Sequence, residues 1–269
     1  MDPRAGTPAE PSDLVDIEAL IDAYHERRPD PSIPAERVVF GTSGHRGSSL
    51  TTSFNEDHIA ATTQAIVDYR NKEGIAGPLF LGADTHALSA PAVQTALRVL
   101  AANAVHVLVD SRDDVVPTPA LSHAIVRHNR TLSQGDPGRA DGIIVTPSHN
   151  PPSDGGFKYN PPHGGPAGSD TTAWIANRAN EIIADGMRAV GDGRARAGRG
   201  QGGADETDGA ASRGEVGRYD FREHYVADLA RIINVSVIAA SGVRIGADPL
   251  GGASVHYWEA IRDRYGLNL

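Results

Sequence analysis

The chain has 269 residues, 39% of them hydrophobic and 22% charged, which is enough to build the core of one large domain or two ordinary ones. It contains no cysteine, which excludes disulfides, thiolate metal sites and a cysteine nucleophile. The formal net charge of -9 argues against nucleic acid and anionic membranes as partners. No apolar run approaches the ~20 residues that span a bilayer. The first residues also lack the apolar core of a signal peptide, so we expect a cytoplasmic protein.

Predicted helices and strands alternate along most of the chain. Apolar residues at helical spacing between Leu14 and Tyr24 predict an amphipathic helix near the N-terminus. Beyond it, short apolar runs predict strands at residues 37–41, 78–82, 105–109, 142–146 and 243–247. Helical patterns predict helices at residues 55–72, 90–103, 118–128, 170–184, 219–233 and 254–265. This alternation predicts an α/β fold with a mixed, mainly parallel sheet layered with helices.

A shift in composition divides the chain. Residues 191–217 consist mainly of Gly, Ala, Arg, Asp and Ser, which cannot build a core, so we expect a flexible linker or surface insertion there. The segment after it has one predicted strand and two helices, too few for a domain that is stable alone. We therefore expect an N-terminal extension (1–36), a first domain (37–190), a linker (191–218) and the truncated start of a second domain (219–269).

The segment richest in chemistry follows the strand predicted at 142–146. Pro147 ends that strand, so Ser148 lies at its carboxyl edge, where open α/β sheets bind ligands. His149 comes next, and Lys158 follows a glycine-rich bend. One loop thus offers a nucleophile, a proton carrier and a cation. A Ser-His pair is often only part of a turn, but the length and composition of this loop favour a functional site.

A Ser-His-Asp hydrolase is the competing interpretation of Ser148. No Gly-x-Ser-x-Gly elbow surrounds this serine. Adjacent side chains also tend to project apart, so His149 is poorly placed to deprotonate its neighbour. The pattern therefore does not favour a hydrolase.

A second group of polar residues lies at residues 40–47, Phe-Gly-Thr-Ser-Gly-His-Arg-Gly, directly after the first predicted strand. Its glycines allow backbone N–H groups to approach an anion, and Thr42 and Ser43 add hydroxyl donors. Arg46 can bind phosphate oxygens through two parallel hydrogen bonds. The Gly-Lys-Ser/Thr ending of a Walker loop is missing, so this is not a P-loop. By itself this segment is weak evidence for phosphate binding.

Together the two segments resemble the α-D-phosphohexomutase superfamily, whose hallmark is a phosphorylated serine in a Thr-Ala/Pro-Ser-His-Asn-Pro loop. Further segments are similar to the branch of bacterial phosphoglucomutases specific for glucose phosphates: residues 4–9, 40–47, 53–58, 82–89, 158–167 and 247–252. The resemblance covers essentially the whole chain except residues 191–217.

The resemblance implies that Ser148 carries a phosphoryl group. It would exchange that group with hexose phosphates, interconverting glucose 1-phosphate and glucose 6-phosphate through glucose 1,6-bisphosphate. Lys158 and His149 would take part in proton transfer to and from the sugar hydroxyl, and Lys158 would also neutralise developing charge. This division of roles suits phosphoryl transfer, which needs mainly positioning and positive charge.

The resemblance also implies a phosphate-binding role for the second group. Arg46 would bind the phosphoryl group, helped by Thr42, Ser43 and His45. Asp84 and His86 follow a strand at a place where the wider family often has Asp-Thr-Arg. Because a histidine replaces that arginine, we give these two residues little weight.

Mg2+ is the cofactor that the resemblance implies, bound through the phosphate on Ser148 and an Asp-x-Asp-x-Asp loop of a second domain. That triplet does not occur in this sequence, nor do the family's sugar-recognition and C-terminal phosphate-binding loops. Family members are roughly twice this long, so we expect a truncated form with little mutase activity alone. Two alternatives stay open: a non-catalytic phosphosugar-binding or interaction module, and a phosphomannomutase or phosphoglucosamine mutase-type enzyme.

Overall fold

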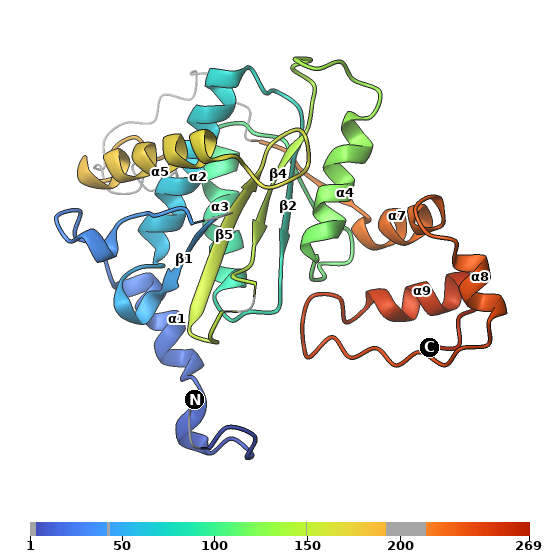
Figure 1. Cartoon of the computed structure of the whole chain (residues 1–269). Coiled ribbons are helices and arrows are strands. Elements are labelled where there is room, and N and C mark those ends of the chain that lie inside the picture. The colour runs from blue at the N-terminus through green and yellow to red at the C-terminus, as the bar shows by residue number, and fades with distance from the viewer. Residues whose placement is uncertain (1–3, 42–43, 149, 192–213) are drawn as a thin grey trace, which may run out of the picture.

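The structure, a computed structural model, describes residues 4–41, 44–148, 150–191 and 214–269. Within these ranges the strands form one six-stranded sheet in the order β1-β5-β4-β2-β3-β6 (Figure 1). The strands are β1 (His45–Ser48), β2 (Leu79–Ala83), β3 (Val107–Asp110), β4 (Asp141–Val145), β5 (Asp154–Asn160) and β6 (Val216–Tyr219). β4, β2, β3 and β6 pair in parallel, whereas β5 pairs antiparallel with both β4 and β1. The predicted mixed, mainly parallel α/β architecture is confirmed.

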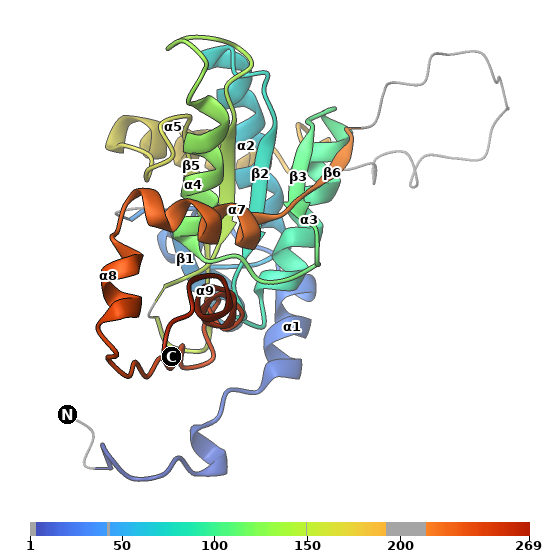
Figure 2. The same ribbon diagram turned by 90° about the vertical axis from the view of Figure 1, so that its right-hand side faces the viewer.

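Helices cover both faces of the sheet. They are α1 (Ile17–Glu26), α2 (Glu56–Glu73), α3 (Ser89–Ala102), α4 (Thr118–Asn129), α5 (Ser169–Ala184), α7 (Phe221–Asp228), α8 (Val235–Ala240) and α9 (Tyr257–Tyr265). Short 3-10 helices lie at Pro11–Asp13, Pro34–Glu36, Ser49–Thr51 and Leu229–Arg231. α2, α3 and α5 pack on one face, and α4, α7 and α9 on the other (Figures 1 and 2). No helix of the described ranges is both long and apolar enough to cross a membrane.

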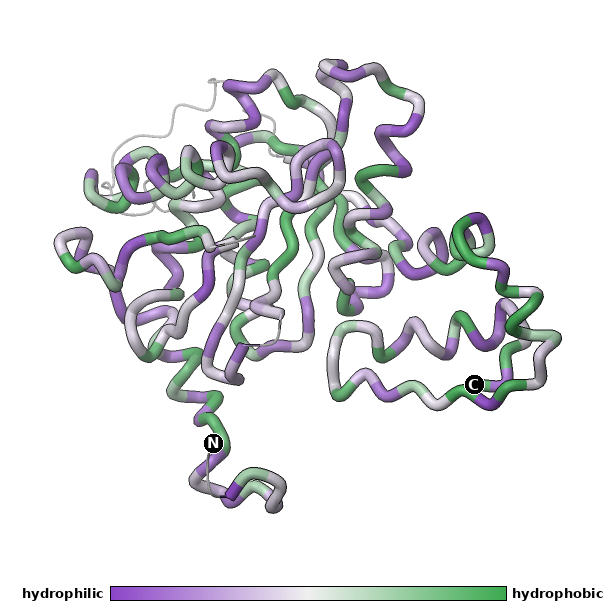
Figure 3. Tube along the Cα trace, in the orientation of Figure 1, coloured by the Kyte–Doolittle hydropathy of each residue, from purple (hydrophilic) through white to green (hydrophobic). Residues whose placement is uncertain are grey.

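The central strands β2 and β4 are largely apolar (Figure 3), and their side chains belong to both layers of the core. On β4, Ile143 and Val145 face the α2–α3–α5 layer, and Ile144 faces the layer of α4 and α7. Successive side chains of a strand point to opposite faces, so a strand buried on both faces is apolar throughout. This continuous apolar pattern is why β2, β3 and β4 were predictable.

Two predicted strands are wrong. Residues 37–41 make only an isolated bridge, between Phe40 and His45. The N–H and C=O of Val38 instead pair with the side-chain amide of Asn180 on α5, both at 2.9 Å, so an amide takes the place of a neighbouring strand. Residues 243–247 are extended and largely exposed, and no strand of the described chain pairs with them.

The linker expected at residues 191–218 overlaps a strand at its carboxyl end. Residues 216–219 form β6, which pairs with β3 in parallel from Val107 to Asp110. α7 then returns across α4, where Phe221 and Val226 are buried in the core (Figure 2). The expected boundary at residue 218 therefore falls within a strand of the main sheet. Residues 192–213 lie outside the described residues.

Candidate functional site

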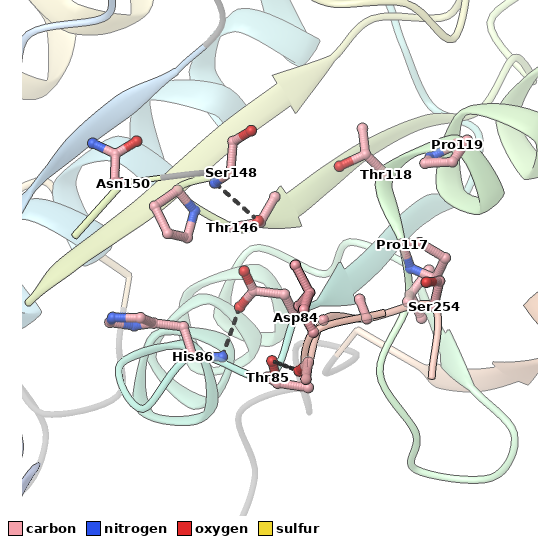
Figure 4. A pocket seen from close by; sticks show the side chains of 16 residues that line it. Asp84, Thr85, His86, Pro117, Thr118, Pro119, Thr146, Ser148, Asn150 and Ser254 are labelled. Carbon is pink, nitrogen blue, oxygen red and sulfur yellow. Dashed lines mark hydrogen bonds between the residues drawn. The ribbon is translucent and has the colours of Figure 1, made fainter. Parts of the chain in front are cut away.

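A cavity of about 440 Å³ lies at the carboxyl edge of β2 and β4 (Figure 4). The two strands are parallel, with Ala83 opposite Val145, and the N–H of Asp84 donates to the Val145 carbonyl at 3.1 Å. The segments that follow the two strands consequently begin side by side. Four stretches of chain line the cavity: residues 84–86, 116–119, 146–150 (His149 is not described) and 250–254.

Ser148 is exposed in this cavity and has an unusual backbone conformation. Its φ is +91°, a backbone angle that residues other than glycine rarely adopt. Its N–H donates to Thr146 Oγ1 at 3.3 Å. Such conformations cost about 1–3 kcal/mol and occur preferentially at functional sites, where surrounding contacts impose them. The fold thus presents one hydroxyl to solvent by forcing its backbone into a rare state.

The stem of the loop that carries Ser148 is fixed from the side of β5 and β1. Arg46 on β1 donates from Nε to the carbonyl of Pro147 at 2.8 Å. Gly156 on β5 lies against the same stem: a Cβ there would be 2.5 Å from Pro147 Cα and closer still to the Thr146 carbonyl oxygen. Any larger residue at position 156 would displace the segment that leads to Ser148.

Lys158 lies on β5 opposite Ile144, and it is 7% exposed. The predicted glycine-rich segment packs directly on it, because a Cβ on Gly44 would lie only 2.5 Å from Lys158 Cγ. Burial lowers the pKa of the Lys158 ammonium, and the positive charge of Arg46 lowers it further, whereas the Asp84 carboxylate partly opposes the shift. A lysine with a lowered pKa gives up its proton more readily than a free lysine, which suits a role in proton exchange.

The charges around Ser148 favour a bound anion. Arg46 and Lys158 are close enough to influence each other, and Arg46 is bonded to the residue before Ser148. Across the cavity, Thr118 opens α4, a helix of 12 residues whose N-terminus adds partial positive charge (Figure 4). Arg46 and Lys158 lie behind the serine loop rather than in the cavity lining, which contains the carboxylate of Asp84. An exposed hydroxyl beside a helix N-terminus and two nearby cations is an arrangement suited to a phosphoryl group.

Asp84 and His86 both line the cavity, although the histidine in place of the family's arginine argued against a role for them. Asp84 Oδ1 accepts hydrogen bonds from the N–H of His86 at 3.0 Å and from Ser89 Oγ at 2.6 Å. The neighbouring Thr85 donates to the Gly251 carbonyl at 2.7 Å and so attaches residues 250–254 to the cavity. Asp84 and His86 come directly after β2, which is parallel to β4. Because parallel strands end at the same edge of a sheet, this position in the sequence could have indicated that the two residues lie near Ser148.

The prediction that His45 contacts phosphate is wrong. Its ring is 1% exposed and stacks between Phe54, at 5.9 Å, and His58, at 5.5 Å. Burial lowers the pKa of His45 to about 4, helped by the nearby His58. His45 and Arg46 are neighbours on β1, so one points into the core while the other reaches the serine loop. Thr42, Ser43 and His149 lie outside the described residues.

A magnesium site is not complete among the residues that the structure describes. No three His, Asp or Glu side chains of these ranges are grouped so that they could hold a metal ion. Asp84 is the single acidic residue among the described residues lining the cavity, and it is already bonded to Ser89. Mg2+ prefers octahedral coordination by several oxygens. The described side chains therefore do not fit the ion on their own.

The chain is similar to known proteins over much of its length. Residues 37–185 match the family described as phosphoglucomutase/phosphomannomutase, alpha/beta/alpha domain I. The chain is 52% identical over 266 residues to a phosphoglucomutase of Komagataeibacter xylinus, covering 99% of this chain and 45% of that protein. It is 35% identical over 157 residues to phosphoglucomutase 1 of Saccharomyces cerevisiae, covering 55% of this chain and 26% of the yeast protein.

Solved structures share the fold. The phosphoglucomutase parafusin of Paramecium superimposes with a TM-score of 0.66 and 22% identity over 90% of this chain and 44% of its own. A protein of Thermus thermophilus described as a putative phosphomannomutase gives 0.62 and 24% over 86% of this chain and 44% of its own. The chain thus spans less than half the length of the relatives it matches. The match to domain I over residues 37–185 shows that the chain belongs to the phosphoglucomutase/phosphomannomutase family.

Proposed function

We propose that this chain provides the phosphoserine part of a phosphoglucomutase, with Ser148 as the residue that carries the phosphoryl group. One observation supports this assignment above the others. Ser148 is exposed at a positive φ, and the carbonyl immediately before it is bonded to a guanidinium. A hydroxyl held this way next to positive charge suits the acceptance and return of a phosphoryl group.

In the proposed reaction, Ser148 Oγ attacks one phosphorus of glucose 1,6-bisphosphate. The Oγ–P bond forms, the bond from phosphorus to the sugar oxygen breaks, and the serine proton ends on that sugar oxygen. The product is a glucose monophosphate. The phosphorylated Ser148 then transfers its phosphoryl group to the free hydroxyl, at position 6 or 1, of another glucose monophosphate, which regenerates the bisphosphate and completes the interconversion. Arg46 neutralises charge on the transferring group, and Lys158, whose pKa is lowered, is proposed to exchange the proton together with His149.

The substrate class of the proposal is hexose phosphates. The choice of glucose over mannose or glucosamine rests on the similarity of residues 4–9, 40–47, 53–58, 82–89, 158–167 and 247–252 to the glucose-specific phosphoglucomutases. The described residues that line the cavity do not by themselves separate the three sugars. We also propose that the complete enzyme requires Mg2+ and that it is cytoplasmic. The residues after β6 are proposed to be the start of a second domain.

The test is conversion of glucose 1-phosphate to glucose 6-phosphate in a coupled assay. Because the chain spans 45% of the bacterial relative, it is assayed alone and with the remaining residues of that relative added as a second polypeptide. We expect little turnover by the chain alone and turnover that depends on Ser148 in the mixture. Mannose 1-phosphate and glucosamine 1-phosphate are the competing substrates.

A binding-only role has a different signature. Glucose phosphates would then raise the melting temperature of the chain equally in the native protein and in Ser148→Ala, with no turnover in either mixture. That result would replace the mutase by a phosphosugar-binding module. Turnover unaffected by Ser148→Ala would also contradict the proposal.

A further inference from the structure

The loop that contains Ser148 is held from two opposite sides of the sheet. It joins β4 to β5, and these neighbours lie between β1 on one side and β2 on the other. Arg46 of β1 bonds to the carbonyl of Pro147 at the start of the loop. His86, in the segment after β2, bonds through Nε2 to the carbonyl of Pro152 near the loop's end, at 2.8 Å.

The ring of His86 is itself fixed. Its Nδ1 accepts the N–H of Leu88 at 3.1 Å, just before α3 begins. A neutral imidazole that accepts at Nδ1 carries its proton on Nε2, so Nε2 is the donor to Pro152. With both ring nitrogens occupied by backbone groups, His86 has no nitrogen left to act on a substrate.

Beyond Pro152 the far end of the loop is held by the pairing of β5 with β1, which begins at Asp154 opposite Ser48. Pro151 and Pro152 have no N–H to donate, so this stretch cannot join a ladder of backbone hydrogen bonds. Nearby, Asn150 donates to Asp154 at 3.2 Å, and the N–H of Asp154 donates to Pro151, but both contacts stay within the same stretch of chain. Between the start of the loop and Asp154, the His86 bond to Pro152 is thus a contact that comes from outside the loop.

We propose that His86 is a positioning residue for the phosphoserine loop, which it fixes to the end of β2 through Pro152. This inference rests on the proposed function for its catalytic consequence, but the contact itself can be tested separately. His86 contacts none of the reacting atoms; it acts by keeping the Ser148 hydroxyl in the cavity. An arginine or glutamine at the same position could donate to the same carbonyl, whereas alanine could not.

The first measurement is hydrogen exchange of the loop amides of Asn150, Ser153 and Asp154 in the native chain, His86→Ala and His86→Gln. Loss of one hydrogen bond that holds the loop should speed exchange there on the order of five- to tenfold in His86→Ala, with partial recovery in His86→Gln. His128→Ala is the matched control, because His128 Nε2 also bonds a backbone carbonyl, that of Gly138, at 3.1 Å. It should leave loop exchange unchanged.

The second measurement is the rate at which Ser148 is phosphorylated by glucose 1,6-bisphosphate, followed by intact mass, with the remaining residues of the bacterial relative present as a second polypeptide. His86→Ala should lower the maximal rate about tenfold or more while leaving the half-saturating concentration of bisphosphate near its native value, since misplacing a reacting group costs rate rather than binding. His86→Gln and His86→Arg should restore part of the rate. A melting temperature measured for each variant separates this effect from unfolding.

The two measurements distinguish failure of the inference from failure of the proposed function. Unchanged loop exchange in a folded His86→Ala protein overturns the positioning role, whatever the chemistry. Faster loop exchange in that variant, combined with a native chain that never becomes phosphorylated, supports the positioning role and removes the proposed function instead. A fall in the maximal rate that neither Gln nor Arg restores would also count against positioning through Pro152.

Discussion

Arg46 Nε donates to the carbonyl oxygen of Pro147 at 2.8 Å, so the proposed phosphate-binding arginine also fixes the backbone next to Ser148. Arg46→Lys keeps the positive charge but loses the planar group that serves both roles. We expect phosphorylation of Ser148 to slow about tenfold or more in this variant, close to the effect of Arg46→Ala. Intact-mass time courses with glucose 1,6-bisphosphate measure it. A lysine variant as fast as the native chain would mean that charge alone is sufficient.

The pH dependence of transfer tests Lys158. Burial and the charge of Arg46 lower the pKa of its ammonium from the ordinary 10.5, so the proton-accepting neutral form increases at a lower pH than for a free lysine. We expect transfer from the phosphorylated chain to a glucose phosphate to accelerate as pH rises toward 10.5 and to level off before it. Lys158→Arg should give a slow, flat profile, because a guanidinium stays protonated. Single-turnover rates across this range decide the matter; parallel profiles for the two proteins would exclude Lys158 as the proton carrier.

His45 should govern acid stability rather than chemistry. Its folded pKa of about 4 lies below the ordinary value of 6.5, so between these values the unfolded chain binds a proton that the folded chain does not. Stability is therefore lost as pH falls through this window, by about 2 kcal/mol between roughly pH 7 and pH 5. His45→Phe should show a smaller loss, leaving the contribution of His58, whose pKa is also lowered by burial.

Urea unfolding at the two pH values measures this difference. The same His45→Phe protein should still accept a phosphoryl group on Ser148. A variant that keeps the native pH dependence would contradict the role of His45 in acid stability. A folded variant that no longer accepts the group would support the predicted role of His45 at the phosphate.

Gly156 should tolerate no side chain. A Cβ there would press on Thr146 and Pro147, so Gly156→Ala should cost about 1–3 kcal/mol of unfolding free energy and slow phosphorylation of Ser148. Gly168→Ala is the control, since a Cβ at Gly168 meets no atom within 4 Å. Chemical denaturation of both proteins gives the comparison. Equal stability of the two variants would mean that the serine loop moves aside without cost.

The sequence predicted those strands whose side chains are buried on both faces, because such strands are apolar throughout. It did not predict β5, whose Asp-Gly-Gly-Phe-Lys-Tyr-Asn run includes two glycines and polar residues. The glycines are needed for close packing: Gly155 lies against the Phe54 ring and Gly156 against Pro147. Local propensity contains no information about such contacts between distant segments.

The candidate site was predictable where a motif follows a strand, as for Ser148. It was less predictable where the direction of a side chain decides its role. His45 and Arg46 belong to the same motif, but strand alternation sends them to opposite sides, and β1 itself was not predicted. The contributions of α4 and of His86 arise from the sheet order, which places the ends of β2 and β4 side by side. That order follows from tertiary packing rather than from any one segment.

The most direct test of the central claim is the location of the phosphoryl group after the chain has been exposed to glucose 1,6-bisphosphate, alone and with the rest of the bacterial relative. Tandem mass spectrometry of proteolytic peptides should find one added phosphoryl group, on Ser148, in the native chain and none in Ser148→Ala. Later addition of a glucose monophosphate should remove it. A phosphoryl group on another residue, or equal uptake by Ser148→Ala, would contradict the assignment of Ser148 as the phosphoryl carrier.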